Sequence, residues 1–394
     1  MDATMSISVL AAVILCLILK CSANLHAAIV SFVEQSSPAV NGDDGASTAN
    51  DCHAKVAKAI ASVISEPPSG APLRVDAVEP SADALPSDIE LHARALLRLM
   101  KQEVKEWEDA PARAEAEAHL DVLTLARFVV ATINTSPSPR PKITGEVVTA
   151  AAAFFRRAMA WRAEWRVAEL LEEFHPRRMA EPVGAGETAT TPAAATGQTA
   201  RTVRQAAAWS HFYNGYGGRT KDGGFFMVER IGAADHASIC SSPELLTVMK
   251  GALLANYELL FRTARASSAA LGHQVYGLVV ADARGASLGL LRHLELIKFA
   301  AANVAANFPE ATQKVLIVNA PRAVAVLWSA VSGLLPESVR AKCRVLSEAA
   351  TRDALRDLVE VAELPRFLGG ERPEAMSCVP LAQKVPKGAW ASRS

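Results

Sequence analysis

The sequence lacks an excess of charge of either sign. Its 394 residues include 41 Lys and Arg and 41 Asp and Glu, so the formal net charge is zero and the pI is near 7.1. Proteins that bind nucleic acid through its phosphates normally carry a basic surface. The balance of charge therefore argues against a nucleic-acid partner, and we expect none.

Cysteine is also scarce, and its spacing excludes the common metal sites. The chain has six cysteines with no C-x-x-C pair, and Cys52 next to His53 is the one place where a cysteine adjoins a histidine. Adjacent residues cannot supply a tetrahedral zinc site by themselves. Scattered cysteines in a chain of this length fit a reducing compartment better than a disulfide framework. We expect no metal and no cofactor, and a cytoplasmic location.

Motifs for nucleotide chemistry are missing. After the apolar segment GLVVAD the chain continues ARGASLG, which is neither G-x-G-x-x-G nor a P-loop. The glycine-rich HFYNGYGGRTKDGG precedes a strand and is interpreted as a turn. Asp282 ends a predicted strand, where we interpret it as a cap or turn residue. A nucleotide-dependent enzyme remains the less favoured alternative, and we expect no catalytic residues.

No hydrophobic run reaches the length of an ordinary membrane span. The longest candidate covers about fifteen residues, Met5 to Leu19, and ends at Lys20, whereas a span needs about 20. Three interpretations stay open: an anchor that leaves the main body in the cytosol, a cleaved signal segment, and a buried or membrane-surface helix.

Changes in composition divide the chain into six predicted segments. Two of them are rich in Ser, Ala, Pro and Gly, which predicts flexible linkers. Between the linkers, apolar residues recur at helical spacing, which predicts a small helical bundle. The segments are 1–33, hydrophobic; 34–86, disordered linker; 87–180, helical module; 181–202, flexible linker; 203–372, main domain; and 373–394, C-terminal tail.

Short apolar strands alternate with amphipathic helices in the main domain. FFMVERIG, QVYGLVVAD, KVLIVNAP and CRVLSEA are predicted strands, and long helical patterns separate the first three. This alternation indicates an α/β fold with a largely parallel sheet.

A nearly uncharged helix is predicted directly after the third strand. Apolar residues at helical spacing extend over 323–335, and half of the whole chain is hydrophobic. One interpretation is a helix buried in the core, and the other is a lid over an apolar cavity. The positions on its apolar face are Val324, Leu327, Trp328, Val331, Leu334 and Leu335.

Four ordered motifs in the main domain resemble the CRAL-TRIO lipid-binding family, which includes fungal-type phosphatidylinositol transfer proteins and retinaldehyde- and tocopherol-binding relatives. FPEATQKVLIVNAP is the most specific, and it resembles the family's Y-P-E and N-A-P stretch. The others are TKDGGFFMVERIG, VVADARGAS and LPRFLGG. In the helical module, LARFVVA and AMAWRAEW resemble signatures of the family's N-terminal companion.

The resemblance implies a mixed, mostly parallel sheet that forms the floor of an apolar pocket, with a helical gate and a preceding helical bundle. The gate follows the N-A-P motif, so here it would extend over about 322–336. The pocket-lining positions expected from this comparison are Val279, Ala281, Leu316, Val318 and Phe226.

Headgroup contacts are also carried over from the resemblance. In phosphatidylinositol-binding relatives a Glu, a Lys and three hydroxyl residues contact the headgroup. Glu310 and Lys342 keep the first two, whereas Gly277, Val279 and Val339 stand where the hydroxyl residues would be. A phosphatidylinositol ligand and a purely structural Glu310–Lys342 ion pair are both consistent with this set.

The resemblance implies a lipid-binding, membrane-associated protein that transfers a phospholipid or another small hydrophobic ligand without making or breaking a bond. A lipid sensor or scaffold that presents its ligand to a partner is the alternative. We expect a monomer that contacts membrane surfaces peripherally.

Overall fold

The fold was analysed in a computed structural model of the chain. The structure describes residues 80, 85–135, 145–174, 204–205, 208, 214–222, 224–287, 293, 295–332 and 342–372. The predicted segments 1–33 and 373–394 lie outside these residues, as does nearly all of the two predicted linkers. Within the described part, no helix is both long enough and apolar enough to cross a membrane.

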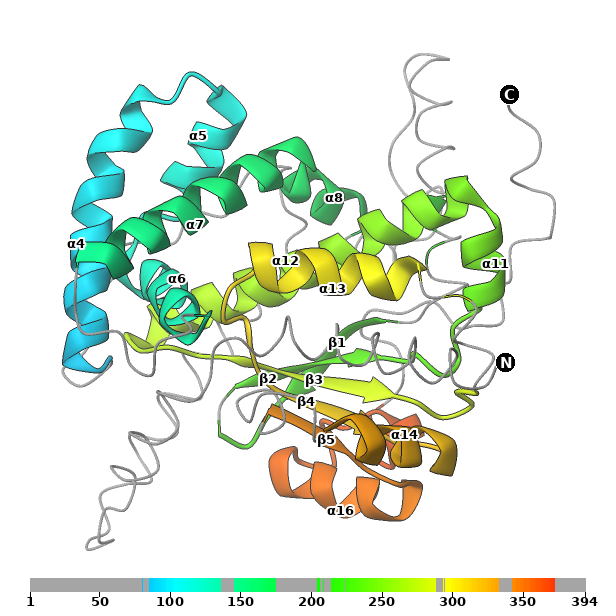
Figure 1. The fold of residues 1–394 in the computed structure, drawn as a ribbon. Coiled ribbons are helices and arrows are strands. Elements are labelled where there is room, and N and C mark those ends of the chain that lie inside the picture. The colour runs from blue at the N-terminus through cyan, green and yellow to red at the C-terminus, as the bar shows by residue number, and fades with distance from the viewer. Residues whose placement is uncertain are drawn as a thin grey trace, which may run out of the picture.

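A helical bundle comes first in the described chain (Figure 1). Its helices are α4 (Ser87–Glu103), α5 (Ala110–Glu117), α6 (Val122–Thr135), α7 (Gly145–Glu164) and α8 (Val167–Phe174), with a short 3-10 turn, η1 (Val104–Glu106), after α4. Leu96, Phe128 and Phe155 are fully buried at its centre. The apolar spacing along α4, α6 and α7 thus places one stripe of each helix in a shared core.

A five-stranded sheet forms the second part, in the order β1-β2-β3-β4-β5. Its strands are β1 (Asn214–Arg219), β2 (Phe225–Glu229), β3 (Gly277–Asp282), β4 (Thr312–Val318) and β5 (Cys343–Val345). The strands from β2 to β5 are parallel, and β1 pairs antiparallel with β2. The predicted α/β class with a mixed, mostly parallel sheet is confirmed.

The glycine-rich segment before β2 is a strand rather than only a turn. Gly217 lies on β1, where a Cβ atom would approach the Phe226 ring to 2.2 Å. The missing side chain therefore lets the β1 backbone pack against this ring. Only Thr220 to Gly224 forms the connection, where the Thr220 amide donates to the Gly224 carbonyl at 3.1 Å.

Helices cover the two faces of the sheet differently (Figure 1). The first face packs against α12 (Pro243–Leu271) and α13 (Glu295–Asn307), with α11 (His236–Ser241) at one end. The second packs against α16 (Glu348–Leu358) and the turn η3 (Arg366–Leu368). Ser242 caps α12 by accepting from the Leu245 amide, and Gly272 ends it in the left-handed conformation at φ 72°.

Buried ion pairs join the helical bundle to the sheet domain. Arg162 of α7 donates to Glu115 of α5 at 3.2 Å and to Glu258 of α12 at 2.7 Å, and Arg262 donates to Glu258 at 2.6 Å. Burial and the neighbouring arginines hold the pKa of His119 well below its usual range. Because removing one partner of a buried pair typically costs 3–5 kcal/mol, this network fixes the bundle against α12.

Candidate functional site: a half-buried sheet face and two polar clusters

The sheet has two apolar faces. The register between β3 and β4 determines which of their side chains lie on the same face. Val279 pairs with Val315, and Ala281 pairs with Ile317. Because successive residues of a strand point to opposite faces, these four lie on the face of α12 and α13. Val279 belongs to the hydrophobic cluster that contains α12, with Val315 packed against it.

The five predicted pocket positions do not share a face. Phe226, Leu316 and Val318 belong to the cluster built around α16, where each is at most 1% exposed. Val279 and Ala281 lie on the opposite face, so the five cannot line one pocket. The positions chosen in β2 and β4 face α16, whereas those chosen in β3 face α12, because successive residues of a strand point to opposite faces.

On β4, the face toward α12 and α13 is less completely buried than the opposite face. Val315 and Ile317 are only half-buried, although Leu316 and Val318 on the same strand are 1% and 0% exposed. On the helices above, Tyr257 of α12 is half-buried too. Apolar side chains that stay partly exposed between a sheet and its covering helices offer a surface on which an apolar ligand can pack.

Phe299 of α13 is another half-buried aromatic side chain on this side. Its ring centroid lies 5.2 Å from that of Trp165, and the amine of Lys250 lies 5.2 Å from its centre. The ring of Trp165, which directly follows α7, and that of Phe299 thus pack against the same cluster as the half-buried Val315. Trp165 and Phe299 both belong to the cluster around α12.

The two predicted headgroup residues meet in the interior. Lys342 immediately precedes β5 and Glu310 lies two residues before β4, so both sit where their strands begin. The Lys342 Nζ atom is 3.7 Å from Glu310 Oε2, and each side chain is 2% exposed. The sequence comparison therefore selected two residues that the fold places together, although this contact does not distinguish a ligand site from a structural pair.

Arg127 of α6 completes this first polar cluster, and the sequence analysis did not single it out. Its guanidinium donates to the Glu310 carbonyl, to Ser268 Oγ at 2.9 Å and to the Val275 carbonyl at 2.7 Å. It also lies 5.2 Å from the centre of the Tyr276 ring. The only signal in the sequence was its place in the motif LARFVVA.

Charge in this cluster is strongly desolvated. Burial lowers the pKa of Arg127, and the nearby Tyr276 and Glu310 oppose that shift. Burial raises the pKa of Tyr276 to about 12, and Arg127 opposes that rise. Arg127 and Lys342 thus place two cationic side chains in one buried cluster with Glu310, and Asp121 also lies close enough to oppose the lowering of the pKa of Arg127. Both cations are of types that pair with anionic groups.

A second cluster at the other ends of the strands is structural. The Asn319 amide donates to Asp282 Oδ1 at 2.9 Å, and the same oxygen accepts from the Arg284 backbone amide at 3.1 Å. Arg230 lies 3.8 Å from the other carboxylate oxygen. Asp282 is 2% exposed and ties two strand ends together, as its interpretation as a turn residue predicted.

The predicted gate corresponds to α14 (Arg322–Ser332), which begins directly after Pro321. Val324 and Trp328 are half-buried, and Val326 is 61% exposed. None of these three belongs to a hydrophobic cluster of the described residues. Leu327 and Val331 belong to α14, but their side chains, together with Leu334 and Leu335, lie outside the described part of the structure.

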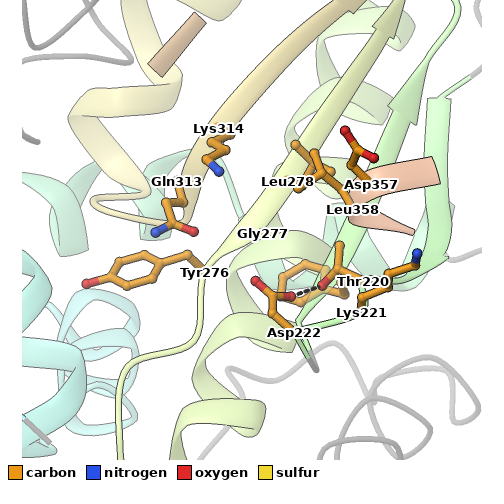
Figure 2. A pocket seen from close by; sticks show the side chains of 11 residues that line it. Thr220, Lys221, Asp222, Tyr276, Gly277, Leu278, Gln313, Lys314, Asp357 and Leu358 are labelled. Atoms are coloured by element: carbon orange, nitrogen blue, oxygen red, sulfur yellow. Dashed lines mark hydrogen bonds between the residues drawn. The ribbon is translucent and has the colours of Figure 1, made fainter. Parts of the chain in front are cut away.

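A small cavity with polar and apolar lining residues lies where β3 and β4 begin (Figure 2). Its volume is about 130 Å³, well below the roughly 300–1,000 Å³ of typical small-molecule pockets. Thr220 donates to Asp222 across its wall at 2.5 Å, and Lys314 and Gln313 approach from β4. It can hold a few water molecules but no lipid tail.

Comparison with known proteins identifies the sheet domain. Residues 211–370 match the family model of the CRAL/TRIO domain. This part of the chain is a CRAL/TRIO domain. The match includes all five strands, the helices on both faces and the Glu310–Lys342 pair.

Relatives of the chain are considerably longer. Protein real-time of Aedes aegypti is 24% identical over 260 residues, which are 62% of this chain and 34% of that protein. Phosphatidylinositol/phosphatidylcholine transfer protein SFH9 of Arabidopsis thaliana is 26% identical over 164 residues, or 41% of this chain and 28% of that protein. The chain thus spans about a third of the length of these curated relatives or less.

Among solved structures, the chain is similar to the crystal structure of Sfh5. The likeness covers 88% of this chain and 94% of that one, with a TM-score of 0.34 and 12% identity. A likeness with so low a TM-score does not bear on the identification of the CRAL/TRIO domain, which rests on the family match and on the sheet.

Proposed function

We propose that the CRAL/TRIO domain binds a phospholipid or another hydrophobic lipid against the half-buried face of β4, and exchanges it between membranes. The observation that carries the proposal is the incomplete burial of Val315 and Ile317 beneath α12 and α13, in contrast to their fully packed neighbours on the other face. The name of the Arabidopsis relative, a phosphatidylinositol/phosphatidylcholine transfer protein, supports phospholipid as the ligand class.

The energetic task of such a protein is to keep hydrocarbon away from water. Transfer of one CH₂ group out of an apolar environment costs about 0.8 kcal/mol, so a phospholipid with some thirty methylenes faces roughly 25 kcal/mol. A protein lowers this barrier by offering an equivalent apolar surface. The strand face, together with the aromatic rings of Phe299 and Trp165, is suited to that role.

Helix α14 is proposed as the gate of the lipid site. It begins directly after β4 and lies beside β4 and β5 in Figure 1, nearer to α16 than to α12 and α13. Val326 exposes an apolar side chain and Trp328 is half-buried. Both residue types are favourable at a bilayer surface when the gate opens.

The cluster of Arg127, Glu310 and Lys342 is the proposed headgroup site. Lysine and arginine pair with phosphate, and glutamate accepts hydrogen bonds from inositol hydroxyls. Phosphatidylinositol would then be distinguished from phosphatidylcholine at the beginning of β4 and β5. No covalent step is needed, so the proposed activity is that of a carrier and not of an enzyme.

Vesicle-to-vesicle transfer tests the proposal. Donor vesicles would contain fluorescent phosphatidylinositol or phosphatidylcholine, and the signal in acceptor vesicles would be followed with and without the full chain. We expect transfer well above the spontaneous rate. Uptake of lipid without transfer would favour the sensor or scaffold alternative, and neither uptake nor transfer would reject lipid binding.

A further inference from the structure

Helix α4 leaves apolar side chains uncovered at one edge of the molecule. Three large hydrophobic side chains of the described residues are exposed, and two of them belong to α4: Leu91 at 56% and Leu99 at 37%. In Figure 1, α4 lies at the edge of the helical bundle, and the other helices of the bundle lie on one side of it. Both leucines are thus on a side of α4 that the bundle does not cover.

These leucines belong to one outward stripe of the helix. Successive residues of an α-helix are about 100° apart, so Leu91, Ala95 and Leu99 lie within an arc of about 80° that extends over roughly 12 Å of the axis. Leu96 and Met100, on the other side of the helix, are fully buried in the bundle core. The small side chain of Ala95 at the centre of the stripe lets the backbone of a second helix approach closely.

Charge is divided between the two ends of α4. Asp88 and Glu90 lie in its first turn, and Lys101 lies in its last turn, shortly after Arg98. The side chains of Asp88, Arg98 and Lys101 are exposed. Glu90 is half-buried and forms an ion pair with Arg94 at 2.8 Å. The helix dipole accounts for this division of charge, but not for the exposed leucines.

An antiparallel pair of α4 helices from two copies of the chain would cover the leucines. If Ala95 faces its own copy across a twofold axis, Leu91 of one copy lies level with Leu99 of the other, because both are four residues from Ala95. Each copy then contributes the same stripe, as a closed dimer with twofold symmetry requires. The pairing removes two exposed leucines of each copy from water, which favours association.

The same pairing brings opposite charges together. Asp88 and Glu90 of one copy lie level with residues 100–102 of the other, which include Lys101, and Arg98 of that copy is close by. A parallel pair would instead place acidic end beside acidic end and basic end beside basic end, which is unfavourable. An anionic membrane surface would repel Asp88 and Glu90 as well. Charge complementarity therefore favours a second copy in the antiparallel orientation.

We propose that α4 is a self-association surface through which two copies of this chain form an antiparallel, twofold-symmetric dimer. The proposal replaces the expectation of a monomer, and it goes beyond lipid binding, on which it does not depend. A contact between two single helices of 17 residues is smaller than the roughly 1,200–2,000 Å² of most stable interfaces. We therefore expect a weak dimer whose population rises with concentration.

Sedimentation equilibrium of the full chain measures the dimer directly. The mean mass is expected to rise with concentration from that of one chain toward that of two. Leu91→Asp places a carboxylate in the apolar stripe of both copies and is expected to raise the dimer dissociation constant about tenfold or more. Because Leu91 is exposed in the single chain, urea unfolding at low concentration should be unchanged. Ala160→Asp, at an exposed position of α7, is the matched control and should dimerise like the wild-type chain.

Reversal of charge tests the orientation of the two helices. One variant, Asp88→Lys with Glu90→Lys, makes both ends of α4 basic. A second variant, Arg98→Glu with Lys101→Glu, makes both ends acidic. Each variant is expected to stay monomeric by itself, because like charges then face each other at both ends of the contact. An equimolar mixture of the two is expected to dimerise at least as strongly as the wild-type chain.

The contrary outcomes are equally specific. A wild-type chain that stays monomeric at every concentration would overturn the proposal, as would self-association that is equal in the wild-type chain and in Leu91→Asp. Failure of the two charge variants to associate when mixed would reject the antiparallel pairing. If Leu91→Asp left the mean mass unchanged and weakened binding to vesicles, α4 would be a membrane contact and not a dimer surface.

Discussion

The Lys342 Nζ atom lies 3.7 Å from Glu310 Oε2, and both side chains are 2% exposed. These residues are distant in sequence and meet where β4 and β5 begin. A pair so deeply buried stabilises the fold only while both partners are present. In the proposed function the same lysine also pairs with a lipid phosphate.

Replacement of Lys342 is expected to separate those two roles. Lys342→Met removes the ion-pair partner that lies 3.7 Å from Glu310 and should lower the free energy of unfolding by about 3–5 kcal/mol. Uptake of phosphatidylinositol by the folded fraction should fall, while phosphatidylcholine uptake persists. Urea unfolding and vesicle uptake measure the two effects.

A double variant provides the control for this change. Glu310→Gln combined with Lys342→Met removes both charges and should recover much of the lost stability. If phosphatidylinositol and phosphatidylcholine uptake fell equally in the single variant at matched folded fraction, the pair would be structural and the headgroup assignment would be wrong.

Two neighbouring residues of β4 test which face of the sheet binds lipid. Val315→Trp adds bulk on the half-buried face and is expected to reduce lipid uptake several-fold with a small loss of stability. Leu316→Ala, on the packed face, should lower the free energy of unfolding by about 2–5 kcal/mol without changing uptake per folded molecule. The reverse pattern, measured by lipid binding and urea unfolding, would assign the ligand to the α16 face.

The exposed apolar residue of α14 tests contact with membranes. Val326 is 61% exposed, and burial of a valine side chain contributes on the order of 1.5–3 kcal/mol. Val326→Asp is therefore expected to weaken vesicle cosedimentation about tenfold or more. Leu91→Asp, at a 56% exposed leucine of α4, is the matched control. Equal weakening by both substitutions would exclude a specific role for α14.

Glu229 predicts a pH dependence of stability. Its pKa is about 7 in the folded chain against 4.5 as the reference value, so between these values the folded state holds a proton that the unfolded state has released. Stability therefore falls as pH rises from about 4.5 to 7, by up to about 3 kcal/mol. Glu229→Gln should remove this component in urea unfolding at pH 5 and pH 8. If the wild-type chain and Glu229→Gln showed the same change of stability with pH, Glu229 would not be the group responsible.

Most of the sheet could be predicted from local sequence because its central strands are continuous apolar runs. Gly277–Asp282 and Thr312–Val318 overlap the predicted strands 274–282 and 314–321. The helix Glu348–Leu358 was not predicted, since it is largely polar and buries only Thr351 and Leu355. Asn214–Arg219 was interpreted as a turn because glycines normally weaken strands, and its pairing depends on the close approach to Phe226.

The candidate site was only partly predictable for the same physical reason. Glu310 and Lys342 were found through a motif, because no local pattern reveals that two strand ends meet. Val315 and Ile317 were not singled out because a buried strand is apolar on both faces, so its sequence does not show which residues face α12 and α13. The pairing of β4 with Val279 and Ala281 of β3 determines which β4 residues lie on each face of the sheet.

Native mass spectrometry of the full chain, purified without added lipid and then incubated with phosphatidylinositol/phosphatidylcholine vesicles, tests the central claim most directly. The account predicts a fraction of molecules heavier than the polypeptide by the mass of one lipid, which tandem fragmentation would identify. A spectrum that contains only the polypeptide mass, both before and after incubation, would contradict lipid binding by this domain.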